Sequence, residues 1–121
     1  MFSFVKELND ESAELLKQLN DRQSAWQRQP RVLVWAFWMG DDLGRANKWA
    51  EQHGIDNIVF AVVLPDDPLL ADWNISPQAP NTLVLACRGN RIMASYAALK
   101  AKDIPRLESQ LPKLLATQKR D

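Results

Sequence analysis

The sequence lacks a second cysteine, has a single histidine and carries no excess of charge of either sign. Cys87 and His53 are alone of their kind, and 15 basic residues balance 15 acidic ones. One cysteine excludes an intramolecular disulfide and a metal cluster held by cysteines. Without a basic stripe the chain also lacks the electrostatic footprint of a nucleic-acid-binding domain. We therefore expect no metal, no cofactor and no nucleic-acid partner.

A long hydrophobic run is also missing. The longest nearly apolar segment, residues 32–39, is far shorter than the roughly 20 residues that span a bilayer as a helix, so we expect no membrane span. The opening residues, MFSFVKELND, turn acidic too early for a secretory signal. We expect a cytoplasmic location from the chain as written, with the periplasm as the alternative if a signal peptide had been removed.

What is present is typical of a globular protein. Hydrophobic residues make up 46% and charged residues 25% of the 121 residues, so the chain can bury a core without a disulfide or a metal. No repeat, low-complexity tract or linker interrupts it. We expect one domain over residues 1–121.

Helix-like and strand-like patterns alternate along the chain. In the first half of the chain they are predicted as an edge strand at Phe2–Val5, a helix over 9–29 ended by Pro30, a strand over 32–38, a helix over 43–53 and a strand over 58–64. The second half is predicted as a short helix opened by residues 65–68 and running through Trp73, strands over 82–87 and 91–96 joined by a turn at 88–90, and a helix from Asp103 that Pro112 should kink or shorten.

This β-α-β-α-β-α-β-β-α order predicts an α/β fold. The early strands should lie parallel through right-handed crossovers, and the final hairpin should add antiparallel strands. The apolar runs at 32–38 and 58–64 are typical of strands covered on both faces. A central mixed sheet with helices on both sides follows.

Several single residues have both a structural and a functional interpretation. Cys87 lies in an apolar run and is expected to be buried, although Arg88 beside it leaves a reactive thiol as the alternative. Asp41 and Asp42 are neighbours on a helix start, so they are expected to cap the helix rather than face each other as an acid–base pair. His53 is expected at a helix end.

The five tryptophans include three with different expected environments. Trp35 is predicted to lie in the core, Trp38 at an exposed strand end and Trp49 partly exposed on its helix. Exposed aromatic side chains at one end of a fold are candidate binding anchors, and packing under loops is the alternative.

Two segments resemble the thioredoxin family. Residues 35–42, WAFWMGDD, resemble its W-A-x-W-C-G-P-C segment, and residues 79–85, APNTLVL, resemble its loop with a cis proline before a strand. The resemblance implies a thioredoxin-like three-layer α/β/α sandwich with a cis peptide bond at Pro80 beside the motif. It also places Met39 and Asp42 at the two cysteine positions and Leu33 where many members have a buried acid.

The resemblance therefore implies the fold without the redox chemistry, because neither methionine nor aspartate takes part in thiol–disulfide exchange. We expect no catalytic residues and a domain that binds a protein or an extended peptide in a chaperone, adaptor or assembly role. The expected groove is formed by Trp38, Met39, Gly40, Asp41, Asp42, Ala79 and Pro80. The alternatives are a thiol-dependent oxidoreductase or transferase acting through Cys87, and a structural subunit that forms a homodimer.

Overall fold

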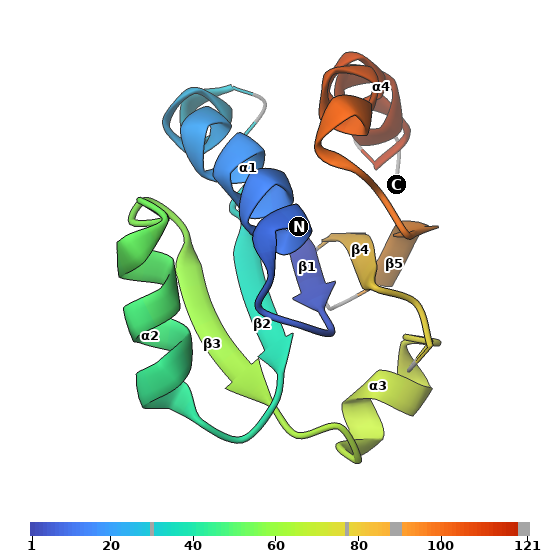
Figure 1. Ribbon diagram of the computed structural model, residues 1–121. Coiled ribbons are helices and arrows are strands. Elements are labelled where there is room, and N and C mark those ends of the chain that lie inside the picture. Colours follow the sequence, from blue (N-terminus) through green and yellow to red (C-terminus); the bar gives the residue numbers. More distant parts are fainter. Residues whose placement is uncertain (30, 77, 88–90, 119–121) are drawn as a thin grey trace.

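The computed structural model describes residues 1–29, 31–76, 78–87 and 91–118, so Pro30 and the predicted turn at 88–90 lie outside the described residues. Within these ranges five strands and four α-helices follow in the predicted order (Figure 1). They are β1 (Phe2–Val5), α1 (Asp10–Arg28), β2 (Trp35–Met39), α2 (Leu43–Gln52), β3 (Val59–Val63), α3 (Pro68–Asp72), β4 (Asn81–Cys87), β5 (Arg91–Ala97) and, after the short 3-10 helix η1 (Ala101–Asp103), α4 (Ile104–Gln118).

The strands form one mixed sheet in the order β3-β2-β1-β4-β5. β1, β2 and β3 lie parallel, whereas β4 is antiparallel to both β1 and β5. The α/β class, the parallel start and the antiparallel hairpin are thus confirmed. The parallel strands need the crossover helices α1 and α2, and the short β4–β5 connection suits an antiparallel pair.

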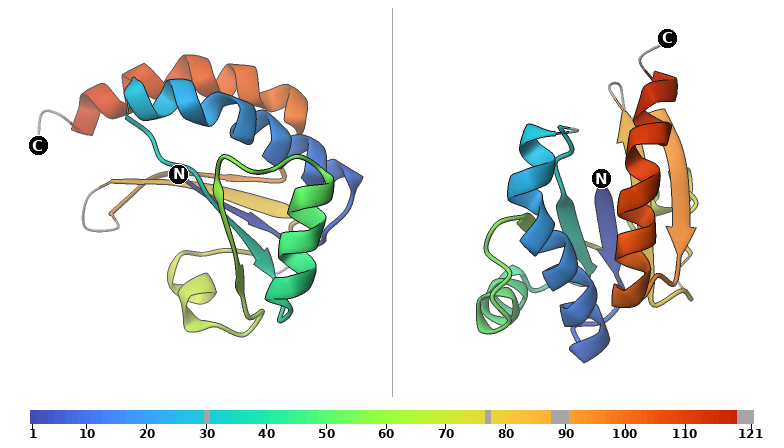
Figure 2. Two further views of the ribbon diagram at one scale, coloured as in Figure 1. Left: turned by 90° about the vertical axis from the view of Figure 1, so that its left-hand side faces the viewer. Right: turned by 90° about the horizontal axis from the view of Figure 1, so that it is seen from above.

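Helices lie on both sides of the sheet. α1 and α4 run side by side over one face (Figure 2), where the Trp26 indole nitrogen of α1 donates a hydrogen bond of 2.9 Å to the Glu108 carboxylate of α4. α2 lies along β3 at the edge of the sheet (Figure 1) and adds Ala46 and Ala50 to the core beneath α1. The short helix α3 packs on the opposite face.

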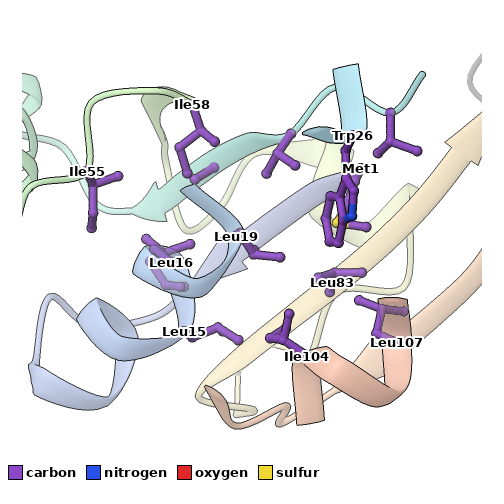
Figure 3. Packing of buried hydrophobic residues seen from close by; sticks show 14 of the residues in the cluster. Met1, Leu15, Leu16, Leu19, Trp26, Ile55, Ile58, Leu83, Ile104 and Leu107 are labelled. Atoms are coloured by element: carbon purple, nitrogen blue, oxygen red, sulfur yellow. The ribbon is translucent and has the colours of Figure 1, made fainter. Parts of the chain in front are cut away.

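The larger core fills the space between the sheet and the helices α1, α2 and α4. Its fully buried leucines and isoleucine come from α1, β4 and α4, and Figure 3 shows them pointing toward one another (Leu15, Leu16, Leu19, Leu83 and Ile104). A smaller core under α3 contains Phe4, Met39 and Leu70. The sheet therefore separates two apolar layers of unequal size.

The prediction that Phe2–Val5 is an edge strand is wrong. β1 pairs with β2 on one side and with β4 on the other, and Ser3, Phe4 and Val5 are fully buried. Phe4 stacks on Phe37 with ring centroids 5.2 Å apart. Four residues suffice for this central strand because each has a pairing partner on both sides.

Two strands predicted to be covered on both faces are partly exposed. β2 begins at Trp35 rather than at residue 32, and Trp35 is 40% exposed. β3 lies at the edge of the sheet, and its first residue, Val59, is 47% exposed. The physical reason is that α3 has only five residues and covers the half of its face that lies near Met39 and Val63.

The helix ends follow local signals. The side chains of Asn9, Asp42 and Asp67 each accept a hydrogen bond of 2.9 or 3.0 Å from a backbone N–H in the first turn of the helix that follows. Gly54 follows α2 with a φ of 68°, the left-handed conformation that favours glycine. Pro112 does not end α4, which continues to Gln118.

Two buried amide side chains join α1 to the segments that enter β2 and β3. The Gln23 amide nitrogen donates to the Val32 carbonyl at 2.9 Å, and its oxygen accepts from the Val34 N–H at 2.6 Å. The Asn20 oxygen accepts from the backbone N–H groups of Asp56 and Asn57 at 3.0 and 2.6 Å. Both residues are 4% exposed, so each amide is buried and uses its polar atoms to pair with backbone groups.

We predict that Gln23→Leu lowers the free energy of unfolding by about 2–3 kcal/mol, because it leaves a buried carbonyl and a buried N–H without partners. Gln27→Leu, at an exposed position of the same helix, is the matched control and should change stability by less than about 0.5 kcal/mol. Urea unfolding followed by circular dichroism measures both. Equal effects of the two substitutions would contradict the bridging role of Gln23.

Candidate binding site

The strand that carries the predicted motif buries its last two side chains on opposite faces of the sheet. Trp38 packs in the larger core and Met39 in the smaller one, and each is 9% exposed. The prediction of an exposed Trp38 is therefore wrong. Successive side chains of a strand point to opposite faces, so Trp38 and Met39 do not line one surface together.

Gly40 follows the strand where a side chain has no room. A Cβ atom there would lie 2.6 Å from the Trp38 ring, and the Gly40 N–H donates to the Trp38 carbonyl at 2.9 Å. The Arg45 guanidinium carbon lies 5.4 Å from the centroid of the same ring. Gly40 and Arg45 thus enclose the indole, which explains the glycine by packing.

Asp41 and Asp42 are exposed at the start of α2. The Asp42 carboxylate accepts a hydrogen bond of 3.0 Å from the Arg45 N–H, so its predicted capping role is confirmed. An acidic side chain at this end of a helix also complements the helix dipole.

The predicted proline loop lies before β4 at the same end of the sheet. Pro80 is exposed and Ala79 is half-buried. The next residue, Asn81, holds the loop in place, because its side chain donates to the Leu99 carbonyl at 2.8 Å and accepts from the Leu99 N–H at 2.9 Å. A rigid loop with exposed backbone can serve as a docking edge for an extended segment.

β1 lies between the proline loop and the motif. Val5 pairs with Trp38 on one side and with Asn81 on the other, and the Lys6 N–H donates to the Pro80 carbonyl at 3.0 Å. The immediate neighbour of the proline loop is therefore the β1–α1 junction, which begins with Lys6 and Glu7. Sequence analysis missed both residues, although a charged pair directly after an apolar strand is a signal of a strand end.

Cys87 lies at the opposite end of β4 from Pro80. It is half-buried rather than buried, and it lines a depression of about 330 Å³ together with Phe2, Arg31, Trp35 and Leu115. The depression includes Met1, whose amino nitrogen donates to the Leu33 carbonyl at 2.8 Å. Burial lowers the pKa of this amino group to about 6, because a low-dielectric surrounding disfavours the charged form.

Further apolar side chains are exposed on the sheet face that α3 leaves uncovered. Val59 pairs with Trp35, which pairs with Phe2, so the three side chains form a row across neighbouring strands. Leu33 precedes this row and is 55% exposed, so it does not occupy the buried position that the resemblance implied for an acid. Trp49 is half-buried, as predicted, against Phe60.

Searches for related proteins found neither a family model nor a curated protein that matches this sequence. Over the described residues, none of the helices is long and apolar enough to cross a membrane. In the same part of the chain, His, Cys, Asp and Glu side chains form no group of three or more placed to hold a metal ion.

We predict that Trp38→Ala lowers the free energy of unfolding by about 3–5 kcal/mol, because it leaves a cavity in the larger core. Trp35→Ala, at an exposed position three residues earlier on the same strand, should lower the free energy of unfolding much less. Thermal and urea unfolding of the two variants provide the measurement. A Trp38→Ala variant as stable as the wild type would show that the indole is not part of the core.

Proposed function

We propose that the chain is a redox-inactive thioredoxin-like domain that binds an extended segment of a partner protein along the proline loop. The observation that carries this proposal is the hydrogen bond between Lys6 and Pro80. It brings Pro80 next to the β1–α1 junction, so that an exposed loop residue lies beside the segment that leads into α1. The proposed docking surface comprises Lys6, Glu7, Ala79 and Pro80.

The lack of cysteines in the motif supports a binding role over a redox role at this end of the sheet. Thiol–disulfide exchange within one domain needs an attacking thiolate and a second thiol that resolves the mixed disulfide. The motif has Met39 and Asp42 at the corresponding positions, and the β1–α1 junction has Lys6 and Glu7. The segments that lead into α1 and α2 therefore carry no cysteine that could attack a substrate.

Strand addition at the loop would need no thiol either. Backbone groups of an extended segment can pair with an exposed backbone edge, while pockets for alternate side chains give selectivity. Ala79 is small and half-buried, so it leaves the neighbouring backbone accessible. A large charged side chain at this position would occupy the space that the partner needs.

The test is the affinity of the partner for a loop variant. A binding protein is first isolated from the native host on immobilised wild-type chain, and its bound segment is then synthesised. We predict that Ala79→Arg weakens binding of this segment about 30-fold, as the loss of a well-placed contact does. Calorimetry gives the affinity.

Ala71→Arg is the matched control, because Ala71 is exposed on α3 and receives the same side chain. It should bind like the wild type. A folded Ala79→Arg variant with wild-type affinity would mean that the partner docks elsewhere on the domain.

A second function is favoured by the surroundings of Cys87. Its half-buried side chain lines a depression that also contains Arg31, and reactive cysteines lie in partly exposed, electropositive surroundings. A thiol-dependent oxidoreductase or transferase would use this end of β4. It would be independent of the proline loop, at the other end of the strand.

Thiol labelling of the native protein separates the two functions. Under the binding proposal we expect Cys87 to react with a maleimide more slowly than a fully exposed cysteine, because packing restricts access. A cysteine introduced by Ser76→Cys, at an exposed loop position, in a chain that also carries Cys87→Ser, supplies the reference rate. Labelling of Cys87 faster than this reference would favour the thiol enzyme.

A further inference from the structure

The two edges of the sheet differ in how they are protected. β5 begins with Arg91, and an irregularity interrupts its register with β4 between Leu85 and Ala86. β3 is VFAVV, without a charge or a proline, and its register with β2 is continuous from Val59 to Val63. Charges, prolines and bulges are the usual devices that keep an edge strand from pairing with another chain. β3 has none of them.

The outer side of β3 is also open in space. β3 ends the sheet, and over the described residues its strand pairing is with β2 alone. The side view in Figure 2 shows β3 at the front, with α2 to one side and α3 to the other, and neither helix crosses in front of it. Phe60 is in ring contact with Trp49 of α2, so α2 covers one face of the strand.

Apolar surface continues from this edge onto the sheet. Val59 is 47% exposed and its partner on β2, Trp35, is 40% exposed. A strand added beside Val59 would place its own side chain against Val59, on the same face of the sheet as Trp35, because neighbouring strands align side chains on one face. The edge thus offers backbone pairing together with an apolar contact.

Acidic residues bracket the edge. Asp56 is exposed before β3 and Asp66 is exposed after it. Antiparallel pairing of β3 with β3 of a second copy over its whole length would centre on Ala61 and set Asp56 opposite Asp66 at both ends. Like charges placed opposite each other destabilise strand pairs. The same charges favour a segment with a basic residue at each end.

We propose that the outer edge of β3 pairs with an extended apolar segment of another protein that carries Lys or Arg at both ends. The segment continues the sheet beyond β3 and covers Val59 and Trp35. This surface is separate from the proline loop, because β2 and β1 lie between β3 and β4. Its test therefore does not depend on the loop proposal.

The probe is a capped synthetic peptide, Lys-Val-Thr-Val-Thr-Val-Lys, and its counterpart with Glu in place of both Lys residues. Amide and indole NMR signals of the full chain are followed during titration. We expect the Lys peptide to shift signals of Val59–Val63 and the Trp35 indole, and the Glu peptide to bind at least about tenfold more weakly.

In two further Lys peptides, alternate amides are N-methylated to block one edge or the other. One of these should lose binding, since strand pairing needs the donors of one edge.

Charge reversal gives the matched variants. The double variant Asp56→Lys, Asp66→Lys should reverse the preference between the two peptides, whereas Glu11→Lys, Glu14→Lys, with the same change of net charge on α1, should retain it. Equal affinity for both peptides, no binding at about millimolar peptide, or shifts confined to other strands would overturn the proposal. If the chain sediments as a dimer, and dimer formation shifts the β3 signals in the absence of peptide, the edge would be assigned to a second copy instead.

Discussion

The pairing of β1 on both of its sides is the constraint on which the rest of the structure depends. This strand of four residues joins the parallel half of the sheet to the antiparallel half, through β2 and β4. It also separates the two cores, since Phe4 faces α3 while Val5 faces α1. The hydroxyl groups of Ser3 on β1 and Thr82 on β4 are buried and have no hydrogen-bond partner among the residues that the structure describes. Such groups cost free energy, so the apolar packing around them must offset that cost.

The position of β1 also determines which loops are neighbours. The resemblance to thioredoxins brings the motif after β2 and the loop before β4 together, but in the sheet β1 lies between these strands. Lys6 then takes the place beside Pro80. The position of β1 between β2 and β4 determines the surroundings of the residues at that end of the sheet. The identity of the residues in the motif carries no information about this strand order.

Local features could be predicted from the sequence because local interactions produce them. Asn9, Asp42 and Gly54 act within a few residues along the chain, and the helix ends lie where their side-chain or backbone preferences indicate. Trp35 was predicted to be buried and Trp38 to be exposed, whereas the structure has Trp35 exposed and Trp38 buried. In the run VLVWAFWM every side chain is apolar or small, so there is no alternation from which to choose the more deeply buried face. The extent of α3, which decides how much of one face is covered, acts across the sheet and leaves no trace in that run.

The short length of α3 has a consequence for binding. A helix long enough to span its face would bury Val59 and Trp35. With five residues, α3 instead buries Met39 and Val63 and leaves the other half of the row exposed. Exposed apolar surface beside the edge strand of a sheet favours aggregation. The acidic residues on either side of β3 reduce the tendency to aggregate, since they oppose pairing between identical copies while favouring a segment of opposite charge. The same charges therefore explain both why this edge can stay exposed and which kind of segment it would bind.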